Sequence, residues 1–558
     1  MLEYQACQRL GGAVLKPLVN PDAQCFDDAC RAFNWQVPPY FNMATAVCDR
    51  HSTMPNRTAL YCENDTGETA QYTFGDLRLL SNQLANAFQE WGIQRGDRVA
   101  IVLPQRVETG LCHLAAWKIG AISLPLSVLF GADALRYRLR DSGARVALCA
   151  GADFDRIQAL RAELPDLQTL INCDDPVGGF WPALERGAAS FKVMNTRADD
   201  PALIIYTSGT TGPPKGAVVA HRCLLGNLPG FEMSQNFFPQ PDDLMWTPAD
   251  WAWTGGLLDG LIPAWFYAQP VLGYDGGRFD VERACDLMSR YRVRNAFIPP
   301  TALKMLRQVD HLAERGVQLR SVMSAGESLG AQLYEWADQM LGVKVNEMWG
   351  QTEFNYIVGN CSAIMPVRPG SMGKSYPGHR VEPVDKDGNV LADGETGELC
   401  AYRDDPVMFL GYWQREQATH DKFIGPWWST GDMGYRDAQG YLWFVGRKDD
   451  VISSAGHRIG PGEIEDCILK HAAVLQAAAV GSPDELRGEI VKAFIVLAKG
   501  HTPSEALAQG IQDAVRRDLA AHEYPREIEF VDELPMTTTG KVRRGELRNR
   551  ERERKGLS

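Results

Sequence analysis

The sequence lacks a surplus of positive charge, and this absence excludes a first large class of functions. Its 70 acidic residues outnumber its 57 basic residues, which gives a net charge of −13. Broad binding to nucleic acid needs a basic surface, because contacts to phosphates supply most of the affinity. We therefore expect no nucleic-acid partner. A basic cluster between Arg543 and Lys555 is interleaved with glutamates and predicts a solvent-exposed helix.

The sequence also lacks long apolar runs and paired cysteines. No run reaches the roughly 18 apolar residues of a membrane-spanning helix, so we expect no stable membrane insertion. The apolar stretch 255–268 contains Asp259 and predicts a buried core helix instead. The first residues lack a basic segment followed by an apolar core, so no signal peptide is expected. The 13 cysteines form no CxxC pair, which favours reduced thiols in a cytoplasmic protein over a disulfide framework or a zinc site.

What the sequence does contain is an alternation of short apolar segments with helical patterns. The segments are bounded by turn or charged residues, as buried strands are. The helical patterns repeat apolar residues every three or four positions. The expected strands are 98–103, 145–149, 202–206 and 296–298, and the expected helices are 75–91, 109–119 and 132–142. Strands that alternate with helices predict an α/β fold with mostly parallel sheets covered by helices.

The pattern changes after residue 370. Glycines punctuate short strand-like pieces up to residue 450, and Asp-Gly pairs at 387–388 and 393–394 are typical of turns. This region predicts antiparallel β structure. The elements expected beyond it are helices 463–471 and 511–519 and strands 477–480, 492–497 and 527–531. We therefore expect a large N-terminal domain, 1–448, and a small α+β C-terminal domain, 449–558.

One loop has the composition of a phosphate site. It follows an expected strand and carries two glycines that let backbone amides approach an anion, four hydroxyl donors and one lysine. These residues are Thr207, Ser208, Gly209, Thr210, Thr211, Gly212 and Lys215. The loop is not a Walker A motif, because Gly216 follows the lysine where that motif has serine or threonine. On composition alone, a flexible surface loop explains the segment equally well.

The exact string of this loop resembles the signature of the adenylate-forming superfamily, which contains acyl-CoA synthetases, firefly-type luciferases and peptide-synthetase adenylation domains. Six further motifs resemble that family and occur in its order: 324–327 (SAGE), 349–353 (WGQTE), 429–432 (STGD), 446–450 (GRKDD), 455–459 (AGHRI) and 535–541 (PMTTTGK). The resemblance implies an ATP-dependent ligase that forms an acyl-adenylate and then a thioester. It also implies a mobile C-terminal domain, with ATP, Mg²⁺ and coenzyme A as the small molecules bound.

The resemblance also implies roles for individual residues in the nucleotide site. Trp349 would stack on adenine, Thr352 would contact the α-phosphate, and Glu353 would help to hold Mg²⁺, which prefers carboxylate and phosphate oxygens. Further nucleotide contacts are implied for Gly326, Glu327 and Gln351. Asp432 would accept hydrogen bonds from both ribose hydroxyls.

The last motifs imply a moving part. Arg447 would contact the ribose, and Asp449 falls at the family's hinge position. Gly456 and Arg458 would border the tunnel for the thiol acceptor. Lys541 would be the catalytic lysine of adenylate formation. Relatives are switched off by acylation of this lysine, so an enzyme that acylates Lys541 is a further hypothesis.

The residues implied to form the acid site are Trp253, Thr254, Gly255, Ala325 and Gly350. Trp253 resembles an aromatic gate, whereas Trp251 and Trp265 are interpreted as core packing. Acetyl-specific relatives have tryptophan at the position of Gly350, so the glycine is expected to leave room for longer chains. The run 368–374 (RPGSMGK) resembles medium-chain acyl-CoA synthetases.

We therefore expect a synthetase for short- to medium-chain acids. The alternatives are an aryl-acid CoA ligase and a stand-alone adenylation enzyme that loads a carrier-protein thiol. A luciferase-like oxygenase and a non-catalytic nucleotide-binding scaffold are more distant alternatives. The intact candidates Lys541, Glu353, Asp432 and Arg447 argue against the scaffold.

Overall fold

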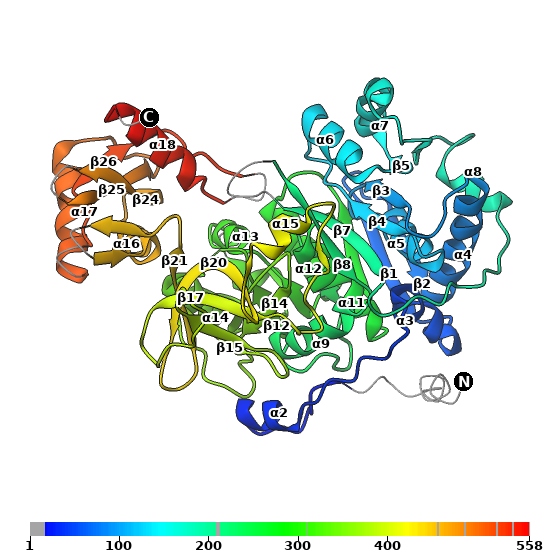
Figure 1. Cartoon of the computed structure of the whole chain (residues 1–558), viewed down its shortest axis with the longest axis horizontal. Helices are drawn as coiled ribbons and strands as arrows, with labels where there is room; N and C mark the ends of the chain where they lie inside the picture. The colour runs from blue at the N-terminus through cyan, green and yellow to red at the C-terminus, as the bar shows by residue number, and fades with distance from the viewer. Residues whose placement is uncertain are drawn as a thin grey trace. The chain divides into compact units, whose positions relative to one another are not determined.

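The computed structural model describes residues 17–207, 213–309, 311–327, 329–454, 457–484, 487–519, 523–537 and 541–556 (Figure 1). The chain divides into two compact units. The first unit contains Met1–Arg368, Gly373–Arg380 and Tyr402–Lys422, and the second contains Pro369–Met372, Val381–Ala401 and Phe423–Ser558. The expected boundary at 448/449 stays a prediction, since this division places part of the β region with the C-terminal residues.

The first unit contains a seven-stranded sheet with the order β18-β8-β7-β4-β3-β5-β6. The strands from β7 to β6 pair in parallel, whereas β8 and β18 are antiparallel additions at one edge. The bounds are β3 Arg98–Val102, β4 Ile122–Pro125, β5 Val146–Cys149, β6 Thr169–Asn172, β7 Pro201–Thr207, β8 Lys215–Ala220 and β18 Gly411–Tyr412. This sheet confirms the expected strands at 98–103, 145–149 and 202–206.

Helix α4 leads from β2 into β3, and the helices after it connect successive parallel strands of this sheet. Their bounds are α4 Phe74–Glu90, α5 Val107–Lys118, α6 Ala132–Ser142, α7 Gly151–Ala159 and α8 Phe180–Arg186. Helix α4 begins at a capping box, in which the Thr73 side chain accepts a hydrogen bond from the Asp76 amide at 3.1 Å and the Asp76 carboxylate accepts one from the Thr73 amide at 2.8 Å. Its apolar residues Leu77, Leu84 and Phe88 are fully buried. The helical spacing that predicted α4 is thus the spacing of its core face.

A second sheet of the first unit runs in the order β14-β13-β12-β11-β9-β10-β1-β2. Its central strands are parallel, and β14 and β2 are antiparallel to their neighbours. The strands are β1 Thr58–Asn64, β2 Thr69–Thr73, β9 Met245–Trp246, β10 Val271–Asp275, β11 Asn295–Phe297, β12 Ser321–Ser324, β13 Val345–Gln351 and β14 Asn355–Gly359. Further helices of the unit are α2 Phe26–Ala32, α3 Met43–Val47, α9 Cys223–Ser234, α12 Val281–Arg290, α13 Pro300–Leu306, α14 Ala331–Met340 and α15 Glu416–His420.

The apolar stretch 255–268 is a buried helix, as expected, but its middle turn is wider than an α-helix. Helix α10 (Thr254–Gly256) leads into a π-helical turn, Leu257–Leu261, and then into α11 (Ile262–Phe266). Asp259 lies in the π turn and is 4% exposed. Burial raises the pKa of Asp259 well above its usual range, opposed by a hydrogen bond with Asn355.

The second unit begins with the expected antiparallel β structure. Its strands are β16 Val381–Val384, β17 Gly397–Tyr402, β19 Phe423–Ile424, β20 Trp427–Arg436 and β21 Leu442–Arg447. Strand β16 pairs antiparallel with β17, and β20 pairs antiparallel with both β19 and β21. Gly388 and Gly394 have φ of 85° and 86° in the turns predicted from their Asp-Gly pairs. This left-handed conformation is the one that favours glycine.

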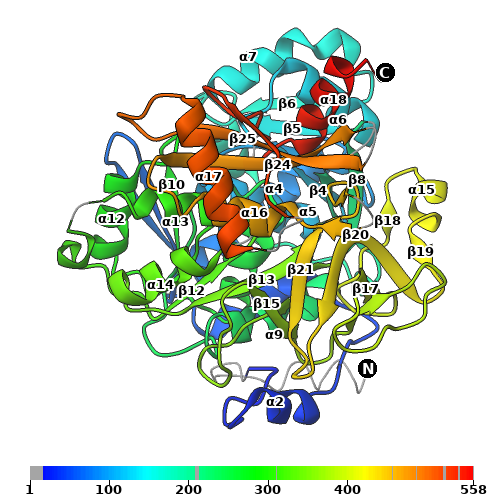
Figure 2. The same cartoon turned by 90° about the vertical axis from the view of Figure 1, so that its left-hand side faces the viewer.

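The C-terminal part of the second unit is a small sheet between helices. The sheet has the order β23-β22-β25-β24, with β26 also paired to β25. The bounds are β22 Ile452–Ser454, β23 His457–Ile459, α16 Pro461–Ile468, β24 Val474–Asp484, β25 Gly488–Leu497, α17 Glu505–Asp518, β26 Glu527–Phe530 and α18 Arg544–Arg554. Figure 2 looks onto α17, with β24 and β25 behind it. Successive residues of β24 face opposite sides: Ala477 and Ala479 pack with α16 and α17, whereas Ala478 and Val480 pack with α18.

The expectation of a solvent-exposed basic helix at 543–555 is wrong in part. The segment is helical, but Leu547 and Glu551 of α18 are each only 1% exposed. Glu551 pairs with the Lys492 ammonium at 2.8 Å inside the unit. Arg544 forms a two-pronged ion pair with Glu465. The interleaved charges therefore have partners on the small sheet and on α16, and α18 completes the core instead of standing in solvent.

Two findings concern the described part of the chain. No helix among the described residues is both long and apolar enough to cross a bilayer. The 12 cysteines in the described part of the chain are all free thiols.

Candidate functional site

The candidate phosphate loop joins two antiparallel strands. Thr207 ends β7, Lys215 begins β8, and the two residues are register partners. Ser208, Gly209, Thr210, Thr211 and Gly212 lie outside the described residues. The loop therefore connects two adjacent antiparallel strands of the seven-stranded sheet, next to its edge strand β18.

Neighbouring elements fix the strand that follows the loop. The Tyr137 hydroxyl donates to the Pro214 carbonyl at 2.9 Å, and the Trp413 amide donates to the Gly216 carbonyl at 2.7 Å. A Cβ on Gly216 would lie 2.7 Å from the Ile204 side chain, so close packing between β7 and β8 requires glycine there. The end of the loop is thus held on both sides.

Glu353 and Lys215 both interact with the side chain of Tyr412. Glu353 is 9% exposed, and its Oε1 atom accepts a hydrogen bond from the Tyr412 hydroxyl. The Lys215 Nζ atom lies 5.2 Å from the centroid of the Tyr412 ring. Within the described part of the chain, no carboxylate pairs with the Lys215 ammonium. Tyr412 was missed by the sequence analysis, because only the pairing of β18 with β8 reveals its position.

The other residues of the WGQTE motif lie where β13 turns into β14. The register between these strands shifts between Trp349 and Gly350. The Trp349 ring lies 5.5 Å from the Phe354 ring at 47°. Gln351 and Thr352 are partly exposed. The motif therefore presents its side chains at the carboxyl end of β13.

Ala325, Gly326 and Glu327 follow the neighbouring parallel strand, β12. Gly326 has a φ of 101°, a backbone conformation that residues other than glycine rarely adopt. Glu327 accepts a hydrogen bond from the Thr301 hydroxyl at 2.6 Å and lies 3.7 Å from the Lys304 ammonium. Because β12 and β13 are parallel neighbours, this motif and the WGQTE motif both lie at the carboxyl ends of their strands, on the same side of one sheet. In α/β sheets, ligands bind at the carboxyl ends of the strands.

The tryptophans in and near the candidate acid site differ in burial. Trp251 and Trp265 are fully buried, which confirms that they pack in the core. Trp253 is only partly buried, and its ring meets the Phe130 ring edge-on at 5.6 Å. Thr254 and Gly255 follow it in α10, and a Cβ on Gly255 would lie 2.5 Å from the Phe297 ring.

The expectation that Gly350 leaves room for a longer acid is wrong. A Cβ at this position would lie 1.5 Å from the Asn355 carbonyl oxygen and 2.4 Å from the Tyr356 Cα atom. The backbone of β14 therefore fills the space that a side chain would need. Glycine is required there by the close approach of two strands, and it says nothing about the length of the acid.

Asp432 and Arg447 are partners in the second unit. They are register neighbours of β20 and β21, and the Asp432 carboxylate accepts a hydrogen bond from the Arg447 guanidinium. Arg447 also donates to the Thr430 carbonyl at 3.0 Å. Asp432 is 5% exposed, so the pair fixes one carboxylate at the end of the STGD turn.

A second carboxylate, Glu398, organises this turn and was missed by the sequence analysis. It accepts hydrogen bonds from the Ser429 hydroxyl, from the Gly431 amide at 2.8 Å and from the Lys448 ammonium at 3.1 Å. Although burial acts in the opposite direction, these donors hold the pKa of Glu398 below its usual range. No local motif marks Glu398, because it reaches the turn from β17.

The remaining candidates also lie in the second unit. Asp449 is exposed in a turn, and its side chain has no partner among the described residues. Gly456 lies outside the described residues, and only the backbone of Arg458 is described, in β23. Lys541 is exposed, and its backbone is tied to Thr537: its amide donates to the Thr537 hydroxyl at 3.0 Å and its carbonyl accepts from the Thr537 amide at 2.7 Å.

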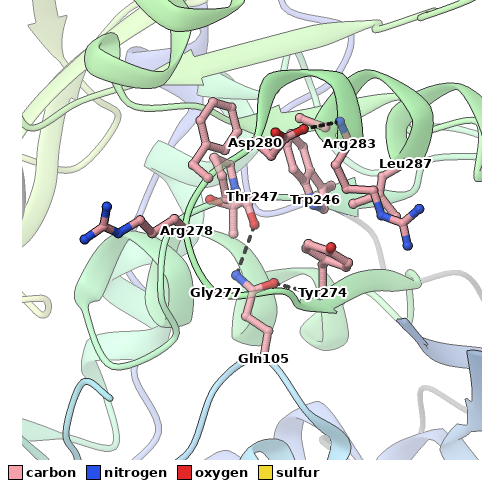
Figure 3. A pocket seen from close by; sticks show the side chains of 12 residues that line it. Gln105, Trp246, Thr247, Tyr274, Gly277, Arg278, Asp280, Arg283 and Leu287 are labelled. Carbon is pink, nitrogen blue, oxygen red and sulfur yellow. Dashed lines mark hydrogen bonds between the residues drawn. The ribbon is translucent and has the colours of Figure 1, made fainter. Parts of the chain in front are cut away.

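A small cavity of about 50 Å³ lies elsewhere in the first unit, between the ends of β9 and β10 and the start of α12 (Figure 3). The Gln105 side chain spans it, donating to the Thr247 carbonyl at 3.1 Å and accepting from the Tyr274 amide at 3.1 Å. None of the candidate site residues lines this cavity. It has room for a few water molecules, far less than the roughly 300 Å³ or more of a substrate pocket.

Comparison with known proteins supports the motifs. Residues 48–413 match the family described as AMP-binding enzyme, and residues 463–541 match the AMP-binding enzyme C-terminal domain. The human mitochondrial acyl-coenzyme A synthetase ACSM4 is 34% identical over 94% of this chain and 93% of its own length. The acyl-CoA ligase YtcI of Bacillus subtilis, which is described as uncharacterized, is 32% identical over 93% of this chain and 98% of its own.

Solved structures give the same result. The crystal structure of the anthranilate CoA ligase AuaEII in complex with anthranoyl-AMP superposes with a TM-score of 0.85, at 28% identity, over 93% of this chain and 99% of that chain. The sequence-based expectation of an α/β N-terminal domain followed by a smaller α+β domain is confirmed by this likeness.

Proposed function

The chain belongs to the AMP-binding enzyme family, and on that premise we propose how its residues activate a carboxylic acid. It is an AMP-forming acyl-CoA synthetase, a ligase that uses ATP to join an acid to coenzyme A. The assignment of roles rests on one observation: the Lys215 ammonium lies over the Tyr412 ring, and the Glu353 carboxylate accepts a hydrogen bond from the Tyr412 hydroxyl. A cation beside the loop and a carboxylate are what a magnesium–polyphosphate complex needs.

In the first half-reaction, the carboxylate oxygen of the acid attacks the α-phosphorus of ATP and pyrophosphate leaves. Negative charge then grows on the transferring and leaving oxygens. Lys541, Lys215 and the hydroxyl donors of the loop stabilise this charge, and Thr352 contacts the α-phosphate. Trp349 stacks on the adenine ring, and Asp432 and Arg447 bind the ribose.

Glu353 fits a magnesium ligand. Its Oε1 atom is held by the Tyr412 hydroxyl, and no hydrogen bond from the described residues reaches Oε2. One oxygen is therefore available for a hard cation. Bound Mg²⁺ would neutralise charge on the phosphate oxygens, while Glu353 would fix where that charge is neutralised.

In the second half-reaction, the thiol of coenzyme A attacks the acyl carbonyl and AMP leaves. We propose that the C-terminal domain, 449–558, turns about Asp449 between the two half-reactions, so that Lys541 serves the first and Gly456 and Arg458 serve the second. The exposure of Asp449 and the lack of a partner for its side chain among the described residues support a hinge at this position. Such two-state rotations occur at a few residues that absorb the change in backbone angles.

Asp449→Pro is expected to slow the complete reaction by about tenfold or more, about 1.4 kcal/mol in the barrier, and to spare ATP–pyrophosphate exchange. Proline fixes φ and so removes the freedom that a hinge needs. Asp449→Ala, which leaves φ free, is the matched control and should behave like the unmodified enzyme. If exchange fell as far as the complete reaction, the hinge would lie elsewhere.

For the acid we propose a short- to medium-chain substrate. The run 368–374 supports this proposal by its similarity to medium-chain synthetases, whereas Gly350 no longer supports it. The second candidate is an aryl acid, which the likeness to an anthranilate CoA ligase favours. The Trp253–Phe130 ring pair and the Phe297 ring beside Gly255 are compatible with either acid. The free thiols support a cytoplasmic enzyme.

The experiment that decides is a panel of acids with ATP and coenzyme A, scored by pyrophosphate release. We expect butyrate to octanoate to be turned over with a higher kcat/KM than acetate and benzoate. Higher kcat/KM for benzoate or anthranilate would replace the aliphatic proposal with the aryl one. Activity with a phosphopantetheinyl carrier protein but not with free coenzyme A would contradict the assignment of the thiol acceptor.

A further inference from the structure

Tyr412 belongs to the segment 409–412, which contacts both the strand that begins with Lys215 and the backbone of Glu353. Strand β18 pairs antiparallel with β8, with Tyr412 opposite Ala217. A few residues earlier, the Phe409 amide donates to the Glu353 carbonyl at 2.8 Å. The segment therefore fixes the backbone of Glu353 relative to the strand that begins with Lys215.

The side chain of Tyr412 makes the same connection between charged groups. Its hydroxyl donates a hydrogen bond to Glu353 Oε1, and its ring lies 5.2 Å from the Lys215 Nζ atom. The side chain itself has little freedom. Tyr412 is 7% exposed, its ring meets the Phe409 ring edge-on at 5.1 Å, and its amide donates to the Thr419 hydroxyl at 2.9 Å.

This arrangement keeps a lysine and a glutamate close to one tyrosine without an ion pair between them. Among the described residues, no carboxylate pairs with Lys215. Glu353 accepts a hydrogen bond from the Tyr412 phenol and not from an ammonium group. A direct Lys–Glu pair would have to break before the lysine could meet a phosphate and the glutamate a cation. A ring face and a hydroxyl hold the two groups more weakly, so each charge stays available for its ligand.

We propose that Tyr412 is a positioning residue of the nucleotide site, which orients the Glu353 carboxylate through its hydroxyl and the Lys215 ammonium through its ring. The proposal rests on the proposed function, in which Glu353 meets magnesium and Lys215 meets phosphate. Groups that orient a metal-binding side chain commonly change metal affinity by 10- to 100-fold when they are removed. The hydrogen bond to Glu353 can be removed alone, because Tyr412→Phe keeps the ring, whereas Tyr412→Leu removes the hydroxyl and the ring together.

The test is calorimetric binding of ATP to the full-length enzyme without acid or coenzyme A, at a series of Mg²⁺ concentrations. Tyr412→Phe is expected to raise the Mg²⁺ concentration for half-maximal tightening about tenfold, with little change in the binding of ATP in excess chelator. Tyr412→Leu is expected to show the same magnesium shift and, in addition, weaker binding of metal-free ATP. The matched control is Tyr376→Phe, which removes another buried hydroxyl, one that donates to the Asn360 carbonyl at 3.1 Å.

Glu353→Gln and the double variant Glu353→Gln/Tyr412→Phe distinguish the proposal from its premise. If Glu353→Gln shifts the magnesium dependence and Tyr412→Phe does not, the role of Tyr412 is wrong and the proposed function stands. If Glu353→Gln causes no shift, the magnesium role of Glu353 is wrong. If the double variant shifts the magnesium dependence no further than Glu353→Gln alone, Tyr412 acts through Glu353. Additive shifts in the double variant would overturn the proposal. A shift in Tyr376→Phe equal to that in Tyr412→Phe would overturn it as well.

Discussion

Replacement of Lys541 by alanine is expected to reduce adenylate formation by about 10²- to 10³-fold, the loss that follows removal of one preorganised donor at a developing charge. The physical reason is that alanine cannot offset the negative charge that builds up as pyrophosphate leaves. The measurement is ATP–pyrophosphate exchange with a good acid substrate. The same variant should still convert a supplied acyl-adenylate and coenzyme A to the thioester, because that step releases AMP and does not need Lys541.

The control variant is Lys499→Ala, which removes another exposed lysine of the second unit and should leave both half-reactions unchanged. If Lys541→Ala lowered the rates of the two half-reactions equally, Lys541 would not act in adenylate formation alone.

Mass spectrometry of protein from cells addresses the related hypothesis of regulation, since acylation would remove the same charge. If Lys541 were never found acylated, that hypothesis would be set aside without effect on the catalytic role.

Where the deciding signal is local, the sequence predicts the fold well. Helix α6 begins and ends at the expected residues, Ala132 and Ser142, because its apolar spacing lies within the segment and Gly143, in a left-handed conformation, follows it directly. The turns at Gly388 and Gly394 follow from the Asp-Gly pairs in the same way. The phosphate loop was placed between its strands because the signature string is continuous.

What the sequence could not predict comes from residues far apart in the chain. Tyr412 reaches Glu353 only because β18 joins the edge of a sheet that contains β8, and Glu398 reaches Ser429 only because β17 lies beside β20. The burial of α18 likewise depends on partners such as Lys492, which no local charge pattern reveals. These pairings decide which groups are fixed in the candidate site, whereas the motifs decide only which groups are present.

Gly350→Ala should lower the free energy of unfolding by about 3 kcal/mol or more, at the upper end of the cost of overpacking. The added methyl group would have to displace the Asn355 carbonyl or the Tyr356 backbone, and neither can move without disturbing the β13–β14 pairing. Chemical denaturation measures the loss. Gly510→Ala is the matched control, because nothing lies within 4 Å of its Cβ position in α17; alanine there should stabilise the helix by about 0.5–1 kcal/mol.

The same variant decides between two explanations of the glycine. If Gly350 lined an open acid pocket, alanine would fold normally and shift the preference toward shorter acids. If β14 fills the space, the variant loses stability, and whatever activity remains keeps its chain-length preference. Loss of stability at Gly350 with a gain at Gly510 would therefore place the determinants of acid specificity elsewhere. The side chains that then need exchange are Phe130, beside the half-buried Trp253 ring, and Phe297, beside Gly255.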